Sequence, residues 1–358
     1  MSIDLHGLSS RRYPQQAKPR AIWDKKQASR IRKPKNNMQP KTEDESIQLV
    51  ALGNGVWLDE IRKGGAEPIK DVPGGSVTFS TLGARLFAAD NPASIGMSFK
   101  AGHDFPESIV DVFSDWAVDL TVHRLSDKPS SRGLVFYDEA NSNRKGFERL
   151  TEPLPVTVRD LRGTSLLSSQ AFTFFGTAEY IETQIADLVM WRPGATRWPF
   201  AIWEPHAKSC RTDTLAAHQR AARLVDVFSP NHEELHSFFG GSGAPAPVDR
   251  AAIENHARIF LGYAARTRLV IVVRAAEHGC LVLLSREVGF WVPPFYPPDS
   301  GEVVDPTGAG NAFLGALAVG WLKHRDYRVA AEYGTVAASF ALEQVGLPVR
   351  SGYRDRTS

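Results

Sequence analysis

The chain has 358 residues, 42% of them hydrophobic, so it has enough apolar material for one large domain or two ordinary ones. Its formal net charge of +2 is unevenly distributed: residues 1–42 hold eleven Lys and Arg against two Asp, a charge of +9, and the remainder carries −7. An acidic body excludes an extended basic groove for nucleic acid in the folded part. No apolar run approaches the roughly 18 residues of a membrane span, so no membrane association is predicted.

Residues 1–45 are predicted to form a disordered basic tail, because basic pairs such as Arg11-Arg12 stand among Gln, Asn and Pro without an amphipathic period. Residues 46–358 are predicted to form one domain. The tail is either a solvated extension or a segment that contacts nucleic acid or directs nuclear import. The two cysteines, Cys210 and Cys280, lack metal-ligand spacing and suit a reducing compartment. We therefore expect a cytoplasmic protein, with a nuclear pool if the tail directs import.

From residue 47 onward, strand-like and helix-like patterns alternate, which is typical of an α/β fold with a mostly parallel sheet. The apolar patterns predict, in chain order, a buried strand at Ile47–Gly53, a helix at Val77–Ala89, short strands at Ala201–Glu204 and Val225–Phe228, a strand at Leu269–Val273 that forms a hairpin with Leu281–Leu284, and a buried helix at Ala312–Leu322. Ligands of such sheets bind beyond the carboxyl ends of the strands, where the polar residues that follow each apolar run are expected to meet.

Residues 305–311, Asp-Pro-Thr-Gly-Ala-Gly-Asn, run directly into the last predicted helix. A Gly-x-Gly turn that opens a helix points free backbone N–H groups at one spot, where the helix dipole also favours negative charge. Glycines let the backbone approach an anion closely, because no Cβ intervenes. This segment therefore predicts a phosphate site.

The segment Ser229-Pro-Asn-His-Glu-Glu234 follows another apolar run and has two interpretations. Asn231 with Glu234 offers the oxygen ligands that a hard cation prefers. Asn231 would equally cap a short helix with acidic residues in its first turn, and both roles are compatible. A third hypothesis is a zinc hydrolase, since His232-Glu-Glu-Leu-His236 is a literal HExxH. Zinc proteases hold that motif in the middle of a long helix, whereas Gly240-Gly241 predicts an early end here.

Residues 305–311 closely resemble the signature of the PfkB (ribokinase-like) carbohydrate kinases, usually Asp-Thr-x-Gly-Ala-Gly-Asp. Asn231 and Glu234 match the Asn-x-x-Glu motif of the same family. The sequences of five further segments resemble the fungal maintenance-of-killer type branch of that family: VPGGSVTFSTLGARLF, KAGHDFP, KPSSRG, IWEP and SPNHEEL. The resemblance covers residues 47–350. It implies a ribokinase-like fold, in which helices flank a central, mostly parallel sheet and a small β-lid comes from residues 55–70 and 120–150.

The resemblance also implies ATP and Mg²⁺ as cofactors, a sugar, nucleoside or related small metabolite as substrate, and a homodimer formed through the lid. It assigns roles to twelve residues: the phosphate turn and base position to Gly308, Ala309, Gly310 and Asn311, substrate binding to Asp59, Gly74 and Gly75, nucleotide binding to Arg274, Gly279 and Thr307, and the metal to Asn231 and Glu234. Arg274 is alternatively a surface ion-pair partner, and Asp59 is alternatively a turn or cap residue.

The last residue of the signature departs from the family, because an Asp that takes the proton of the attacking hydroxyl is replaced by Asn311, and an amide is no general base. Phe79 replaces a family Asn, and Ala276 replaces a family Gly. Two functions remain open: a slow or specialised kinase, and a non-catalytic protein that binds a nucleotide or metabolite and works through partners. A kinase transfers phosphate from ATP with Mg²⁺, whereas a binding protein only gains stability from the nucleotide.

Overall fold

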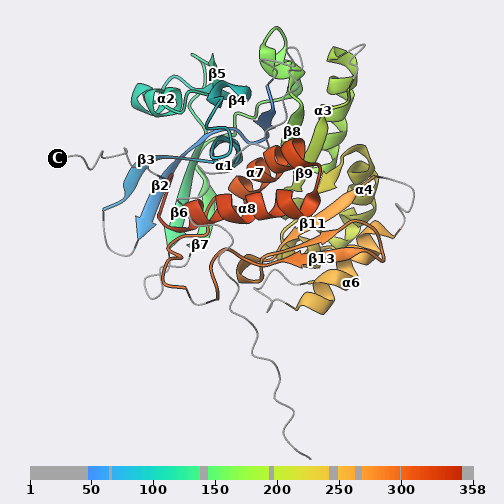
Figure 1. The fold of residues 1–358 in the computed structure, drawn as a ribbon. Coiled ribbons are helices and arrows are strands. Elements are labelled where there is room, and N and C mark those ends of the chain that lie inside the picture. The colour runs from blue at the N-terminus through green and yellow to red at the C-terminus, as the bar shows by residue number, and fades with distance from the viewer. Residues whose placement is uncertain are drawn as a thin grey trace, which may run out of the picture. The chain divides into compact units, whose positions relative to one another are not determined.

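The computed structural model describes residues 47–63, 67–137, 144–192, 197–241, 249–262, 268–298 and 300–348 (Figure 1). The predicted basic tail, residues 1–45, lies outside this set, so its state stays a prediction. None of the helices formed by the described residues is long and apolar enough to cross a membrane.

A nine-stranded sheet forms the centre of the domain, in the order β13-β12-β11-β10-β9-β8-β1-β4-β5. The strands from β5 to β11 pair in parallel, and β12 and β13 add an antiparallel edge. Their bounds are β1 Leu49–Leu52, β4 Ile95–Ala101, β5 Asp119–Arg124, β8 Ala171–Gly176, β9 Phe200–Pro205, β10 Val227–Phe228, β11 Val270–Arg274, β12 Cys280–Leu283 and β13 Gly289–Val292. The predicted mostly parallel sheet and the hairpin of β11 with β12 are both present.

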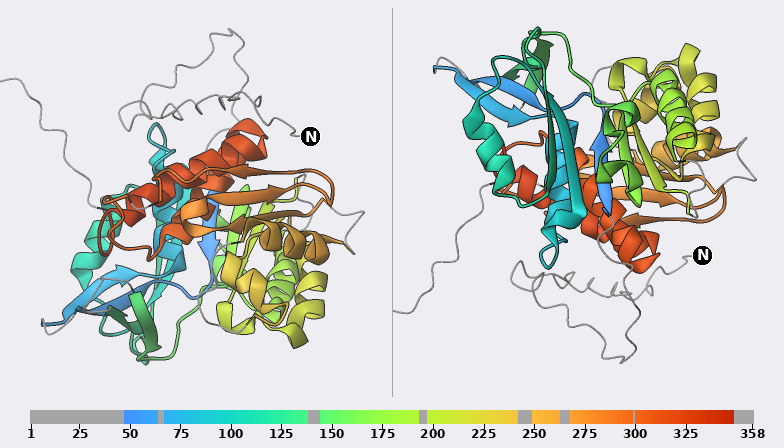
Figure 2. Two further views of the ribbon diagram at one scale, coloured as in Figure 1. Left: turned by 90° about the horizontal axis from the view of Figure 1, so that it is seen from below. Right: turned by 90° about the horizontal axis from the view of Figure 1, so that it is seen from above.

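Helices cover both faces of this sheet, which explains why its inner strands are largely apolar and buried, whereas the edge strands β5 and β13 are partly exposed. Successive residues of β1 point to opposite faces, so Leu49 packs with one helix layer and Val50 with the other. Figure 2 shows the two layers on opposite sides of the strands. One layer holds α1 Ser76–Arg85, α7 Ala309–His324 and α8 Tyr327–Leu342, and the other holds α3 Ala178–Trp191, α4 Leu215–Ala221, α5 His232–Ser237 and α6 Arg250–Leu261. The helix α2, Glu107–Ser114, packs its apolar residues against β4.

A second, four-stranded sheet has the order β3-β2-β6-β7 and corresponds to the predicted lid. Its strands are β2 Trp57–Lys63, β3 Ile69–Gly74, β6 Arg132–Tyr137 and β7 Arg144–Arg149. They come from two separate parts of the chain that meet where β2 and β6 pair in parallel. The lid strands therefore fall close to the two segments that the sequence indicates.

Helices α1 and α7 approach each other closely because glycine occupies their contact on both sides. A Cβ at Gly83 would lie 2.1 Å from the carbonyl oxygen of Ala312, and one at Gly315 would lie 1.9 Å from that of Ser80. No side chain fits between the backbones at these points. This contact places the first turn of α7 beside the second half of α1.

Candidate functional site

The predicted phosphate turn opens α7. Gly308 is the N-cap residue and has φ +81°, a left-handed conformation that favours glycine. The ring of Phe79 packs against it, so a Cβ at Gly308 would lie 2.3 Å from that ring. The N–H of Ala312 donates to the carbonyl oxygen of Gly308, four residues earlier, at 2.9 Å. Of the N–H groups before it, that of Ala309 donates to Pro306 O at 3.3 Å, and those of Gly308 and Gly310 point from the helix N-terminus, where an anion is favoured.

Thr307, immediately before this turn, carries a buried hydroxyl that has no hydrogen-bond partner among the described residues. Its backbone N–H donates to Asp305 Oδ1 at 3.0 Å, so the loop itself is held. A buried polar group without a hydrogen-bond partner destabilises the folded protein, and binding of a ligand is one way in which such a group gains a partner. The Thr307 hydroxyl and the N-terminus of α7 together suit a phosphate oxygen.

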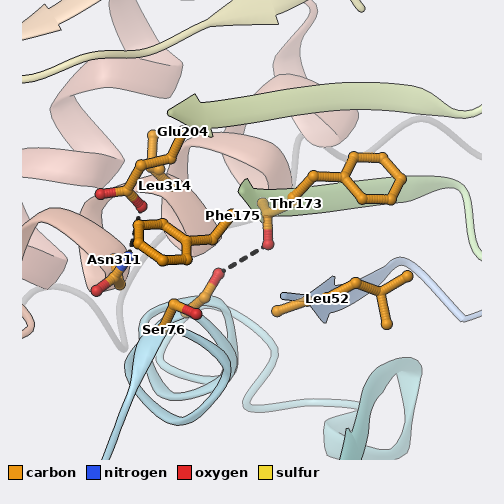
Figure 3. Close-up of a pocket in the computed structure, with 10 residues that line it drawn as sticks. Leu52, Ser76, Thr173, Phe175, Glu204, Asn311 and Leu314 are labelled. Carbon is orange, nitrogen blue, oxygen red and sulfur yellow. Dashed lines mark hydrogen bonds between the residues drawn. The ribbon is translucent and has the colours of Figure 1, made fainter. Parts of the chain in front are cut away.

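Asn311, at the family's base position, lies in the first turn of α7 and donates through Nδ2 to Glu204 Oε2 at 2.5 Å. Glu204 stands at the carboxyl end of β9, where the sheet places polar residues beyond buried strands. Figure 3 shows the two side chains facing each other, with the Asn311 oxygen directed away from Glu204. The base position is thus occupied by an amide that is bonded to a carboxylate from another strand.

Arg274, at the end of β11, forms ion pairs with two carboxylates. Its guanidinium lies 2.9 Å from Glu204 Oε1 and 3.5 Å from Glu234 Oε2, and it also donates to Ser229 O at 3.0 Å. Only 12% of its side chain is exposed, so this is a buried ion pair rather than a surface one. A Cβ at Gly310 would lie 2.2 Å from Arg274 Nη1, so the glycine of the turn makes room for the cation.

Burial has a large effect on both carboxylates. It raises the pKa of Glu204, against the opposing effects of the Arg274 charge and the Asn311 hydrogen bond. Burial also raises the pKa of Glu234 to about 7, although the Arg274 charge again opposes it. Removing Arg274 would leave both carboxylates buried without a compensating positive charge, which is strongly unfavourable.

Asn231 and Glu234 form the capping box that the sequence predicts for α5. Asn231 Oδ1 accepts from Glu234 N–H and Glu234 Oε2 accepts from Asn231 N–H, both at 2.7 Å. The HExxH pair, His232 and His236, lies on the same six-residue helix. The structure has no group of three His, Cys, Asp or Glu residues placed to hold a metal ion, within the residues it describes. Nothing therefore supports the zinc hypothesis.

A small cavity of about 10 Å³ lies beside Asn311 and Glu204, at the carboxyl ends of β1, β8 and β9 (Figure 3). Its walls are mostly apolar, and its polar lining residues are Ser76, Ser80, Thr173, Glu204 and Asn311. The hydroxyls of Ser80 and Thr173 bond to each other at 3.1 Å. The Ser76 hydroxyl is buried and is without a partner in the described part of the chain. The cavity thus has room for about one water-sized polar group, such as a single hydroxyl.

The predicted substrate residues gather next to this cavity without lining it. Asp59, on β2 of the lid, is buried and lies so close to Gly74 that a Cβ there would be 2.4 Å from Asp59 Oδ2. Gly75 has φ +92° and begins α1, directly before Ser76. Phe79 packs under the phosphate turn instead of pointing into the cavity. The Phe79 ring packs against Gly308, and this contact explains why residue 79 is apolar.

The predicted nucleotide glycine, Gly279, lies between β11 and β12 with φ +83°. A Cβ there would lie 2.0 Å from Val292 O, so the close approach of β13 requires glycine. Ala276, in the same turn, has φ +47°, a conformation that a glycine adopts more readily. Both positions of this turn thus have positive φ, and Ala276 takes up a conformation that favours glycine.

The sequence predictions omitted Glu204 and the cavity hydroxyls. The signal for Glu204 was present, since it ends a predicted strand and polar residues at strand ends meet in this fold. The serines and Thr173 had no such signal, because Ser76, Ser80 and Thr173 stand inside elements. Their role depends on how α1 packs against β8.

Comparisons with known proteins agree with this architecture. Residues 204–349 match the model described as pfkB family carbohydrate kinase. The chain is 27% identical over 332 residues to Protein MAK32 of Saccharomyces cerevisiae, an alignment covering 87% of this chain and 88% of that protein. It is 27% identical over 329 residues to an uncharacterised protein of Schizosaccharomyces pombe, with 86% and 87% covered. A ribokinase structure from Giardia lamblia superposes with a TM-score of 0.64 at 14% identity, covering 85% and 94% of the two chains.

Both the resemblance to PfkB proteins of the fungal maintenance-of-killer type and the ribokinase-like fold are thereby confirmed.

Proposed function

We propose that this chain, a relative of the PfkB carbohydrate kinases and of fungal MAK32, is an ATP-dependent kinase that phosphorylates a hydroxyl of a small metabolite. The observation that carries the proposal is the placement of the open N-terminus of α7 beside the cavity that Asn311 lines. Phosphoryl transfer depends mainly on positioning and charge stabilisation, and these two features would supply both.

The phosphate turn would hold the transferred phosphoryl group. N–H groups of Gly308 and Gly310 would donate to its oxygens as negative charge shifts, and the Thr307 hydroxyl would find a partner there. The N–H of Ala309, which donates to Pro306 O at 3.3 Å in the free protein, would exchange that partner for a phosphate oxygen. The Arg274 guanidinium, packed against Gly310, adds positive charge at the same end of the helix. The Gly279 loop would lie against the nucleotide.

Asn231 and Glu234 would hold Mg²⁺. The capping box uses Oε2 of Glu234, and a carboxylate offers two oxygens. Burial raises the pKa of Glu234 to about 7, so a nearby cation would favour its charged form. The donor set therefore fits a hard cation. When bound, Mg²⁺ would neutralise charge on the phosphates.

The reactive hydroxyl of the acceptor would enter the small cavity between α1 and β8. Ser76 would supply a hydrogen bond to it, and Asn311 would orient its reactive hydroxyl through the side-chain oxygen. Asp59, Gly74 and Gly75 would close over it from the lid side. Sugars, nucleosides and related polyols are the substrate classes to test.

A second candidate function is a protein that binds nucleotide or metabolite without turnover. Asn311 favours it, because an amide cannot take up the proton of the acceptor. The two candidates are separated by titrating the protein with Mg·ATP in a calorimeter and assaying ATP turnover with a panel of sugars, nucleosides and polyols. We expect binding with turnover for one acceptor class. Binding without turnover would support the second candidate, and absence of binding would contradict both.

A further inference from the structure

Glu204 is a buried carboxylate in the wall of the proposed acceptor cavity, and its two oxygens have different partners. Oε1 pairs with Arg274 at 2.9 Å, and Oε2 accepts from Asn311 at 2.5 Å. Only 9% of its side chain is exposed. Burying an ionised carboxylate lowers the stability of the fold, so the presence of Glu204 at this buried position calls for an explanation.

Charge balance alone does not account for Glu204. Arg274 already has Glu234 within 3.5 Å as a second carboxylate partner and donates to Ser229 O. Glu204 is the acidic residue that lines the cavity, among the described residues. Its Oε2 accepts a hydrogen bond from Asn311, the residue at the position where the family has its catalytic Asp. A carboxylate is therefore present next to that position, although residue 311 is an amide.

We propose that Glu204 is the general base of this kinase, and that Asn311 is a positioning residue that holds Oε2 of Glu204 toward the acceptor hydroxyl. The inference rests on the proposed kinase function and gives that site a proton acceptor. In this arrangement the carboxylate comes from Glu204 on β9 and the amide from Asn311 on α7, so the site has a proton acceptor although residue 311 is an amide.

The reaction balances with ATP as the phosphoryl donor. The O–H bond of the acceptor breaks and its proton passes to Glu204, while the hydroxyl oxygen forms a bond to the γ-phosphorus. The bond from that phosphorus to the β–γ bridging oxygen breaks, and ADP leaves with the electron pair. Asn311 keeps its N–H donated to Glu204 and needs no change of protonation.

The groups around Glu204 set its pH behaviour. Arg274 faces it from β11, Glu234 lies on the far side of that guanidinium on α5, and the buried Cys210 interacts with all three charges. Burial raises the pKa of Glu204 above its ordinary value of about 4.3, which brings a carboxylate closer to the range in which bases work well. Turnover should therefore fall as the pH drops through that raised value.

Four proteins test the assignment: the wild type, Glu204→Gln, Asn311→Asp and the double variant. With Glu204 as base, Glu204→Gln should lower kcat by about 10²- to 10⁴-fold while the Kd for Mg·ATP changes less than about threefold. Asn311→Asp should give no gain, because two adjacent carboxylates share one proton. The double variant should recover at least tenfold over Glu204→Gln, since it exchanges the positions of acid and amide.

Asp226→Asn is the control, because Asp226 is a half-buried carboxylate directly before β10, accepts from Ala201 N–H at 2.9 Å and is absent from the cavity wall. Its kcat should stay within twofold of the wild type. Turnover of Glu204→Gln within twofold of wild type, or a tenfold gain from Asn311→Asp alone, would overturn the assignment while leaving the kinase function standing. A wild type that never turns over ATP would overturn both.

Should Glu204→Gln fail to fold, the wild-type profile of kcat against pH still decides. A fall in kcat at an apparent pKa above that of an ordinary carboxylate supports Glu204 when the Kd for Mg·ATP stays constant over the same pH range, because protonation of Glu234 would weaken metal binding as well. A kcat that is flat down to about pH 4.5 overturns the assignment.

Discussion

At the scale of single residues, the candidate site contains polar groups whose partners are missing or unusual. The Thr307 and Ser76 hydroxyls are buried without partners in the described part of the chain. Each such group costs about 1–3 kcal/mol relative to a satisfied one. They stand at the two places where the proposed ligands would meet, at the phosphate turn and in the acceptor cavity. We interpret them as groups that gain their hydrogen bonds when ligands bind.

Thr307→Val tests this interpretation at the phosphate turn. The valine keeps the shape and removes a hydroxyl that has no partner in the free protein, so we expect an unchanged or raised melting temperature. The Kd for Mg·ATP should rise about two- to tenfold, the value of one hydrogen bond, in a calorimetric titration. Thr81→Val is the control, because its hydroxyl is also buried and unpartnered in the described structure but belongs to α1 away from the turn. Equal affinities for both variants would contradict the role of Thr307.

At the scale of elements, the site depends on how closely α1 and α7 pack. Gly83 and Gly315 remove the side chains that would hold the helices apart, and Phe79 then reaches Gly308 under the phosphate turn. The same contact aligns Ser76 on α1 with Asn311 on α7, both of which line the cavity. The geometry of the site is therefore a property of a helix pair.

Gly83→Ala should separate these helices. In an isolated helix the change would stabilise by about 0.5–1 kcal/mol, but here the new Cβ would lie 2.1 Å from Ala312 O. Overpacking of this kind costs about 1–3 kcal/mol, so we expect a net loss in the free energy of unfolding, measured with urea, together with weaker ATP binding. Gly301→Ala meets no atom within 4 Å and should be nearly neutral. A more stable Gly83→Ala protein would contradict the tight packing.

At the scale of the whole domain, an ion-pair network joins the lid sheet to the central sheet. Asp104, in the loop after β4, accepts from Ser130 N–H at 2.7 Å and from Arg132 Nε at 2.8 Å. Arg132 begins β6 of the lid and also donates to Asp71 of β3 at 2.7 Å. Burial tends to raise the pKa of Asp104, but the hydrogen bonds from Ser130 and Arg132 outweigh it and lower that pKa. The charged form of Asp104 therefore anchors the lid.

This network predicts a pH dependence of stability. Because the pKa of Asp104 is lower in the folded than in the unfolded protein, its contribution is present above the ordinary value of about 3.9 and is lost as the pH falls below it. Asp104→Asn should lower the free energy of unfolding by about 1–2 kcal/mol at pH 7, and the difference from wild type should shrink toward pH 3. Urea titrations across this range provide the measurement.

The exposed pair of Asp213 with Arg211 offers the control for Asp104. Asp213→Asn should leave the free energy of unfolding essentially unchanged at pH 7, because solvent screens this exposed pair. A loss for Asp104→Asn that is equally small, or that is the same at pH 3 as at pH 7, would show that the network does not hold the lid.

The sequence by itself determined the features that depend on neighbouring residues. The alternating and continuous apolar runs predicted β1, β9 and β11, and the glycine turn before α7 and the Asn231–Glu234 cap were both legible, because their hydrogen bonds close within a few residues. The resemblance to the PfkB family, and with it the fold and the lid, also followed from motifs in the chain.

Only the tertiary structure decided what surrounds the base position. Glu204 and Asn311 are 107 residues apart, and Arg274 reaches both Glu204 and the glycine turn from a third element. These contacts exist because parallel strands bring their carboxyl ends to one edge of the sheet and because α1 and α7 pack without side chains between them. From residue 311 alone the site looks like a kinase without a base. Its neighbours across the fold supply a carboxylate.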